Sequence, residues 1–230
     1  MTVTVGGPQR DRKALMQALR LYVLTDERED DEQLLGIVDE AILGGATAIQ
    51  LRRKQTLGRR FVELGLALRK RTRERGVLFF INDRVDVAAL VDADGVHVGQ
   101  NDISCRDARR LLGEDKWIGV SAETVMQALE AQAQGADYLG VGAIYATPSK
   151  PDAAVTGLDG LAEIARQVDL PIVAIGGLHL GNLTSPLSVG AHGVAVVSEV
   201  MSAPQPREAA QALAQRLQAH LSVHTDGGLG

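Results

Sequence analysis

The chain has 230 residues, of which 45% are hydrophobic and 23% charged, which is typical of a globular protein built around one large core. Its 24 Lys and Arg residues against 29 Asp and Glu residues give a net charge of −5 without a separate basic run, which argues against nucleic acid as the main partner. Because no apolar stretch could span a membrane, the N-terminus lacks a signal-peptide pattern and the single Cys105 can form no internal disulfide, we expect a cytoplasmic protein without a membrane partner.

Eight short apolar runs alternate along the chain with longer segments of helical periodicity. In chain order the runs are 21–25, 46–51, 77–81, 95–98, 117–121, 138–141, 171–175 and 193–197. Each run is brief and almost wholly apolar, as expected of parallel strands that are covered on both faces. The intervening segments repeat Leu, Ile, Val or Ala every three or four residues, which predicts helices. Clear examples are 32–43, 59–75, 122–134 and 158–168.

Alternating strands and helices with short connections can form an open doubly wound sheet or a closed barrel. Eight units within about 200 residues favour closure, and no G-x-G-x-x-G motif follows the first strand, as a dinucleotide-binding sheet would require. We therefore predict an α/β protein of one domain, a (β/α)8 TIM barrel at residues 21–219. Residues 1–20 would form an N-terminal extension with a short helix, and residues 220–230 a flexible C-terminal tail.

In such a barrel, catalytic groups follow the C-terminal ends of the strands, so polar residues at these points are the candidates. Gln50, Arg52 and Lys54 alternate at the end of the second strand and would share one side if the strand continued. A guanidinium fork and a mobile ammonium suit a diphosphate. The alternative is a solvated basic strand end, which is our interpretation for Arg53 alone.

Carboxylates follow the next two strands. Asn82-Asp83 ends the third strand, and Asp102 follows the fourth. Two carboxylates, together with substrate phosphate oxygens and water, would complete the coordination shell of Mg²⁺. Either aspartate alone could instead cap a following helix, but the pair at matching strand ends favours a metal. His97 lies within an apolar run, which favours a hydrogen-bonded core histidine over a catalytic base.

A polar loop, GAIYATPSKPD, follows the sixth strand and is about twice as long as a typical connection. Its Thr147, Ser149 and Lys150 offer two hydroxyls and an ammonium, which suit a phosphate monoester, although a plain surface loop remains the alternative. Ser121 ends the fifth strand. It could contact a substrate or cap the helix that begins near Glu123.

The seventh and eighth strands end in a pattern that is typical of phosphate binding. Gly176-Gly177 follows the seventh strand, and Val197-Ser198 ends the eighth. Many β/α barrels hold a phosphate here with backbone amides and a short helix. Glycine allows the close approach that backbone amides need. A packing turn is the alternative for the two glycines, but their combination with Val197-Ser198 favours a phosphate.

Together these motifs resemble the thiamine phosphate synthase family over about residues 20–204. The matching segments, in family order, are Gln50-x-Arg52-x-Lys54, Asn82-Asp83, GVHVGQND ending at Asp102, GADYLGVGAIYATPSK ending at Lys150, and AIGG ending at Gly177. The resemblance implies a transferase that joins 4-amino-2-methyl-5-(diphosphooxymethyl)pyrimidine to 4-methyl-5-(2-phosphooxyethyl)thiazole, giving thiamine phosphate and diphosphate. It also implies Mg²⁺ as cofactor and two small phosphorylated substrates as partners. A homodimer is compatible with it.

The resemblance also implies a role for each matching residue. The pyrimidine diphosphate would be bound by Gln50, Arg52, Lys54, Asn82 and Ser121, with Lys150 on the departing diphosphate. Mg²⁺ would be held by Asp83 and Asp102. The thiazole phosphate would be bound by Thr147, Ser149, Gly177, Val197 and Ser198. In the dissociative mechanism of the family, diphosphate leaves first and the thiazole nitrogen captures the resulting cation. Lys54, Lys150 and Arg52 would be the catalytic cations.

The chain departs from the family pattern at four positions. Ser149 stands where a second Thr is usual, and Ala143 and Ala146 replace prolines in the same loop. Glu199 follows Ser198 where a small residue is common, and its carboxylate could repel the thiazole phosphate. These departures bear on affinity for the thiazole phosphate more than on the type of reaction.

Other functions fit parts of the pattern. A thiazole tautomerase-like isomerase of the same fold would need no diphosphate or metal groups, so the retained Gln50, Arg52, Lys54, Asp83 and Asp102 argue against it. A sugar-phosphate decarboxylase or isomerase could use the carboxylates and a lysine for proton transfer. The alternative that is not an enzyme is a barrel that binds a phosphorylated metabolite without catalysis.

Overall fold

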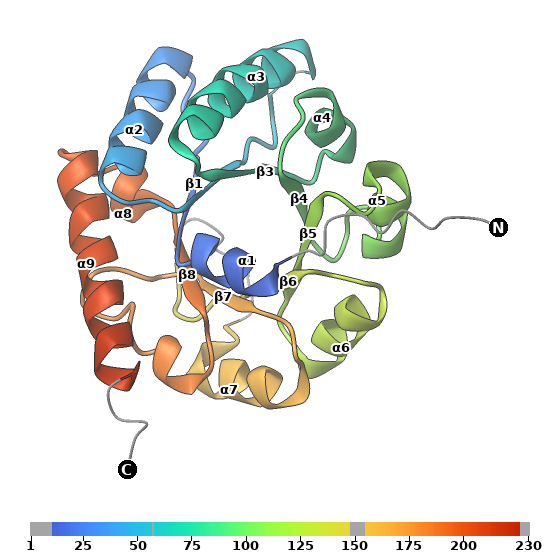
Figure 1. Ribbon diagram of the computed structural model, residues 1–230, viewed down its shortest axis with the longest axis vertical. Helices are drawn as coiled ribbons and strands as arrows, with labels where there is room; N and C mark the ends of the chain where they lie inside the picture. Colours follow the sequence, from blue (N-terminus) through green and yellow to red (C-terminus); the bar gives the residue numbers. More distant parts are fainter. Residues whose placement is uncertain (1–10, 57, 148–154, 226–230) are drawn as a thin grey trace.

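Eight parallel strands close into a barrel, each paired with its neighbours in chain order, and β1 pairs with both β2 and β8. The computed structural model describes residues 11–56, 58–147 and 155–225. Figure 1 shows the strands as a ring surrounded by helices. The predicted (β/α)8 barrel is therefore confirmed. The strands are β1 (Leu21–Leu24), β2 (Ala48–Leu51), β3 (Leu78–Asn82), β4 (Gly95–Val98), β5 (Trp117–Ala122), β6 (Tyr138–Val141), β7 (Ile172–Ile175) and β8 (Gly193–Val196).

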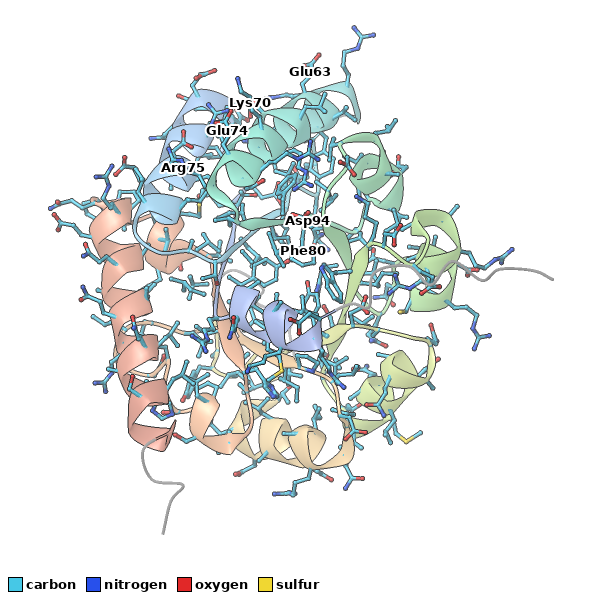
Figure 2. All side chains as sticks on the ribbon, viewed as in Figure 1. Glu63, Lys70, Glu74, Arg75, Phe80 and Asp94 are labelled. Atoms are coloured by element: carbon cyan, nitrogen blue, oxygen red, sulfur yellow. The ribbon has the colours of Figure 1, made fainter. Side chains whose placement is uncertain are left out.

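Helices surround the ring of strands (Figure 1), and the longer ones bury an apolar face against it. In α3, Leu64 and Leu68 are buried, whereas Lys70 and Glu74 are exposed on the outer side of the helix (Figure 2). No helix in the described part of the chain is both long and apolar enough to cross a membrane. The elements are α2 (Asp31–Leu43), α3 (Gly58–Arg75), α4 (Val85–Leu90), α5 (Cys105–Leu112), α6 (Val125–Ala133), α7 (Gly157–Gln167), the 3-10 helix η1 (Leu187–Val189), α8 (Ser198–Met201) and α9 (Pro206–Thr225).

The last helix, α9, runs to Thr225, beyond residue 219, where we expected a flexible tail to begin. No proline or glycine occurs between Pro206 and Gly227, so the sequence contains no strong signal that would end the helix earlier. Leu213 and Leu217 are buried at helical spacing and anchor α9 to the barrel. The predicted start of the tail at residue 220 is therefore wrong, since α9 continues to Thr225. Residues 226–230 lie outside the described part of the chain.

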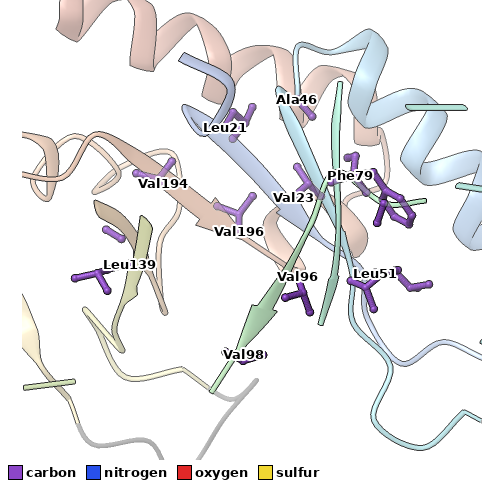
Figure 3. Packing of buried hydrophobic residues seen from close by; sticks show 14 of the residues in the cluster. Leu21, Val23, Ala46, Leu51, Phe79, Val96, Val98, Leu139, Val194 and Val196 are labelled. Atoms are coloured by element: carbon purple, nitrogen blue, oxygen red, sulfur yellow. The ribbon is translucent and has the colours of Figure 1, made fainter. Parts of the chain in front are cut away.

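The strands send alternate side chains to two separate apolar layers. Val23, Phe79 and Val96 belong to the large layer between the strands and the helices, part of which is shown in Figure 3. Tyr22, Phe80 and Tyr138 belong to the smaller layer inside the barrel. Figure 2 places Phe80 within the ring of strands. The three inner aromatic rings have centroids 5.4–6.3 Å apart, so the barrel is filled rather than hollow.

A short helix, α1 (Arg12–Ala18), lies across the N-terminal opening of the barrel (Figure 1). Asp11 caps it by accepting hydrogen bonds from the backbone N–H groups of Lys13 and Ala14. Leu15 and Leu19 are buried and belong to the inner apolar layer. The helix therefore closes the end of the barrel that lies opposite the predicted site.

Replacing Leu15 with alanine should lower the free energy of unfolding by about 2–5 kcal/mol, because it leaves a cavity beneath the strands. The measurement is urea denaturation followed by far-UV circular dichroism. Leu111→Ala is the matched control, since Leu111 is 66% exposed and its loss should change stability little. Equal stability of the two variants would show that α1 does not close the barrel in solution.

Candidate active site

The chain leaves the barrel wall at Leu51, just before two of the predicted cations. Arg52 and Lys54 therefore do not continue the strand, and the expected alternation with Gln50 along β2 ends after Gln50. The backbone N–H of Arg52 donates to Oγ1 of Thr25, at 2.9 Å. Glu27 lies 3.6 Å from the Arg52 guanidinium and accepts a 3.0 Å hydrogen bond from the Lys54 backbone N–H. Residues of the connection after β1 therefore contact both Arg52 and Lys54 at the end of β2.

Arg53 is the exception in this segment, and our prediction of a solvated strand end is wrong for it. Its side chain is almost fully buried, and its Nη1 lies 2.9 Å from Oδ1 of Asp31 in the first turn of α2. It also donates to the carbonyl oxygen of Arg28. Arg53 points toward the helix layer, where a carboxylate and a carbonyl compensate its buried charge. Its role is structural.

The two predicted metal carboxylates lie together beside Lys54. Lys54 Nζ is 3.6 Å from Asp83 Oδ2, and the carboxyl group of Asp102 is close enough to Asp83 to affect its pKa. Burial and the neighbouring Asp102 raise the pKa of Asp83 to about 6, whereas the Lys54 ammonium acts to lower it. This crowding of negative charge is what a bound cation would relieve.

The backbone at these strand ends fixes where the carboxylates lie. Asp83 has a positive φ of 61°, and its N–H donates to the His97 carbonyl oxygen at 2.8 Å, which ties the end of β3 to β4. Oδ2 of Asp102 accepts a 2.8 Å hydrogen bond from the Gly99 N–H. Both aspartates therefore belong to the connections that leave neighbouring strands.

Helix capping does not account for the polar residues at these strand ends. The side chain of Ser104 caps α5, and that of Thr124 caps α6. The helix that follows Asp83, α4, begins without a side-chain cap. Asp83, Asp102 and Ser121 therefore have no capping role in the described structure, and the alternative interpretation of each is not supported.

A chain of polar side chains crosses the inside of the barrel from β2 to β5. Gln50 Nε2 donates to Tyr22 Oη at 2.8 Å, and Tyr22 Oη lies 3.2 Å from Tyr138 Oη. His97 Nδ1 lies 3.1 Å from Tyr138 Oη, and its Nε2 lies 3.0 Å from Ser121 Oγ. Burial lowers the pKa of His97 to about 4. The prediction of a hydrogen-bonded core histidine is confirmed.

The loop after β6 runs beside the end of β7. Ile144 N–H donates to the Ile175 carbonyl oxygen, and Tyr145 N–H donates to that of Gly176, both at 3.0 Å. Gly177 has a positive φ of 66°, and a Cβ there would lie 2.7 Å from Tyr145 Cβ. Only glycine fits this turn.

The predicted hydroxyls of the same loop fall at the edge of what the structure describes. Thr147 is partly buried near the end of the described segment. Ser149 and Lys150 lie outside the described residues.

Val197 and Ser198 lead from β8 into the short helix α8. Glu199, whose carboxylate could repel a phosphate, accepts a 3.3 Å hydrogen bond from the Leu180 N–H in the loop after β7. The carboxylate is therefore engaged with backbone rather than left unpaired beside Ser198. The ends of β7 and β8 are joined by this contact.

Sequence reasoning missed three residues that organise this end of the barrel. Glu27 stands in an acidic segment directly after the first apolar run, and its position at a strand end was the signal that could have identified it. Tyr22 and Tyr138 stand inside apolar runs and resemble ordinary core residues. Only the closed barrel brings their hydroxyl groups together.

A closed β/α barrel with cations and paired carboxylates at the C-terminal strand ends defines a barrel enzyme that handles phosphorylated substrates. Residues 21–200 match the family model described as thiamine monophosphate synthase. The chain belongs to this family and is a transferase, which confirms the resemblance seen in the sequence. The reaction of the family condenses a pyrimidine with a thiazole.

Three similar proteins carry the same name or function. The thiamine-phosphate synthase of Roseiflexus sp. strain RS-1 is 51% identical over 195 residues, covering 84% of this chain and 83% of that protein. The thiamine-phosphate synthase of Methanobrevibacter smithii is 42% identical and covers 87% and 96%. The solved structure of the Pyrococcus furiosus thiamine phosphate pyrophosphorylase superposes with a TM-score of 0.82 at 42% identity, covering 90% of this chain and 99% of that one.

Proposed function

We propose that this protein condenses 4-amino-2-methyl-5-(diphosphooxymethyl)pyrimidine with 4-methyl-5-(2-phosphooxyethyl)thiazole in a Mg²⁺-dependent reaction that yields thiamine phosphate and diphosphate. The observation that carries the proposal is the Lys54 ammonium 3.6 Å from Asp83, with Asp102 beside it. A departing diphosphate needs such cations, whereas thiazole isomerisation does not. The arrangement therefore favours the synthase over the tautomerase-like alternative.

Asp83 and Asp102 fit a magnesium site by their chemistry. Both offer carboxylate oxygens, which Mg²⁺ prefers, and burial together with the neighbouring Asp102 raises the pKa of Asp83. The described residues contain no group of three or more possible His, Cys, Asp or Glu ligands. We therefore assign the remaining coordination positions to substrate oxygens and water. Mg²⁺ supplies charge stabilisation for the leaving diphosphate.

The side chains of this end of the barrel bind and orient the pyrimidine diphosphate. Arg52 and Lys54 neutralise the diphosphate, and we assign Lys150 to the same role from its match to the family motif. Asn82 ends β3 beside Asp83, while Gln50 and Ser121 contact the pyrimidine ring. Because the mechanism is dissociative, protein side chains need only stabilise charge that develops on the leaving group.

The thiazole phosphate binds at the ends of β6, β7 and β8. Backbone amides at Gly177 and at Val197-Ser198 hold its oxygens, as is common in β/α barrels. Thr147 and Ser149 add hydroxyl groups. The two substrates thus approach from opposite sides of the barrel mouth, which brings the thiazole nitrogen to the pyrimidine methylene carbon.

Gly177→Ala should raise the KM for the thiazole phosphate by about tenfold, since a residue with a Cβ at positive φ is strained by about 1–3 kcal/mol. The added methyl group would also push against Tyr145. Steady-state kinetics with each substrate varied in turn measures the effect. Gly76→Ala, also at positive φ but with open space around it, controls for strain alone. An unchanged KM in Gly177→Ala would remove this residue from the phosphate site.

The function is tested by incubating the purified protein with both precursors in Mg²⁺ or in EDTA. We expect thiamine phosphate and diphosphate in equal amounts, with Mg²⁺ only. Isomerisation of the thiazole without condensation would favour the tautomerase-like function. Mg²⁺-dependent binding without turnover would favour the non-catalytic barrel.

We further propose that residues 21–219 form the catalytic domain and that residues 1–20 are an N-terminal extension to it. A cytoplasmic location and a homodimer complete the proposal. The single Cys105, which is buried, leaves no intrachain disulfide to form in an oxidising compartment. Cell fractionation tests the location, and sedimentation velocity of the full chain tests the homodimer.

A further inference from the structure

The polar chain inside the barrel occupies space that two glycines leave open for it. A Cβ at Gly119 would lie 2.1 Å from Tyr138 Cζ and 2.5 Å from His97 Nδ1. A Cβ at Gly140 would lie 2.9 Å from His97 Cε1. Real Cβ atoms essentially never show contacts under 3.0 Å, so a larger residue at either position would force the neighbouring ring to shift. The two glycines of the barrel wall therefore make room for this series of hydrogen-bonded side chains.

The hydrogen atoms available in this chain set the direction of its bonds. Gln50 Nε2 donates to Tyr22 Oη, and Tyr22 has one proton of its own to donate. Within the described residues, Tyr138 Oη is its other hydrogen-bond partner. Tyr138 then donates its proton to His97 Nδ1. A neutral His97 carries its proton on Nε2 and donates it to Ser121 Oγ.

The two ends of this ordered chain are the groups that we assign to the pyrimidine. Gln50 is 2% exposed, and its Oε1 has no hydrogen-bond partner among the described residues. It can only accept. The oxygen of Ser121 receives the His97 proton, so its own hydroxyl proton remains to be donated. An aminopyrimidine offers both an N–H donor and ring-nitrogen acceptors, which match an acceptor at Gln50 and a donor at Ser121.

We propose that Tyr22, Tyr138 and His97 are positioning residues that fix Gln50 as an acceptor and Ser121 as a donor, and so select the amino form of the pyrimidine against its 4-oxo counterpart. This inference rests on the proposed function. The oxo analogue places an acceptor where the amino group places a donor, which leaves Gln50 Oε1 facing another acceptor. Sites built for such a hydrogen bond discriminate strongly against an analogue that lacks it.

The reverse order of the chain makes a distinct prediction. If the Gln50 amide were turned, Tyr22 would donate to Gln50, Tyr138 to Tyr22, and His97 would carry its proton on Nδ1. Gln50 would then offer N–H groups to the site, which would favour the oxo analogue. The tautomer of His97 therefore shows in which direction the hydrogen bonds run from Gln50 to Ser121.

The first test is ¹⁵N NMR of the full-length protein labelled at its five histidines, with His97→Gln used to assign the His97 signals. We expect the Nε2–H tautomer at neutral pH. The Nδ1–H tautomer would overturn the proposal. This measurement needs no turnover, so its result stands whether or not the condensation is observed.

The second test compares kcat/KM for the amino and 4-oxo pyrimidine diphosphates. In Tyr138→Phe the Tyr22 proton loses its acceptor and turns to the Gln50 carbonyl, so we expect the preference for the amino substrate to fall at least tenfold. Thr72→Val is the matched control, because Thr72 is another buried hydroxyl and it donates to backbone carbonyl oxygens within α3. The preference of this variant for the amino over the 4-oxo substrate should equal that of the unmodified protein.

Tyr22→Phe provides an independent variant if Tyr138→Phe does not fold. It removes the partner that orients the Gln50 amide, and we expect the same loss of preference. An unchanged preference in either folded variant would overturn the positioning role. Absence of condensation in the unmodified protein would instead contradict the proposed function, and the tautomer measurement would still decide the direction of the chain.

Discussion

Asp83→Asn lowers kcat/KM for the condensation by about 10²- to 10³-fold, on the scale of losing one group that stabilises charge in a transition state. The substitution removes one of two carboxylates that we assign to Mg²⁺, and it leaves the shape of the side chain almost unchanged. Asparagine also tolerates the positive φ of 61° at this position. The expected loss therefore reflects missing charge rather than a distorted turn.

The measurement is steady-state kinetics over a range of Mg²⁺ concentrations, with the pyrimidine diphosphate varied and the thiazole phosphate saturating. We expect Asp83→Asn to need more Mg²⁺ for half-maximal rate. Asp86→Asn is the matched control, because Asp86 lies on α4 three residues away and pairs with Arg84 outside the site. Equal Mg²⁺ requirements in the two variants would contradict a metal-binding role for Asp83.

Lys54→Gln lowers kcat by about 10²-fold or more, because the ammonium stabilises charge that appears on the diphosphate as it departs. The side chain is 55% exposed, so its loss should change the free energy of unfolding by less than about 0.5 kcal/mol. Kinetic and structural effects are therefore separable at this position. Rapid-quench measurement of diphosphate release in a single turnover reports the chemical step itself.

Lys70→Gln is the control for the loss of a lysine charge. Lys70 is exposed on α3, outside the ring of strands (Figure 2), and its substitution should leave kcat unchanged. If Lys54→Gln raised only the KM for the pyrimidine diphosphate, the ammonium would serve binding rather than the departure of diphosphate.

The barrel could be predicted because its strands are short, apolar and evenly spaced. Parallel strands that are covered on both faces leave such a pattern, and each of the eight expected runs overlaps an observed strand, with ends that agree to within two residues. The approach of Lys54 to Asp83 also follows from order along the chain, since consecutive parallel strands end side by side.

Features that depend on distant partners could not be predicted in this way. Arg53 is buried because α2 places Asp31 beside it, and no local pattern indicates that contact. The hydroxyl groups of Tyr22 and Tyr138 meet only because the sheet closes. The end of β2 at Leu51 depends on contacts with Thr25 and Glu27 from another connection.

The close approach of Gly119 and Gly140 to the inner rings has a consequence for how this sequence can change over time. A methyl group at position 119 would overlap Tyr138 and His97, and one at position 140 would crowd His97. These four positions must therefore change together: a related barrel with a larger residue at 119 or 140 should carry a smaller one at 97 or 138. Such coupled substitution would be visible in an alignment as covariation between β4, β5 and β6.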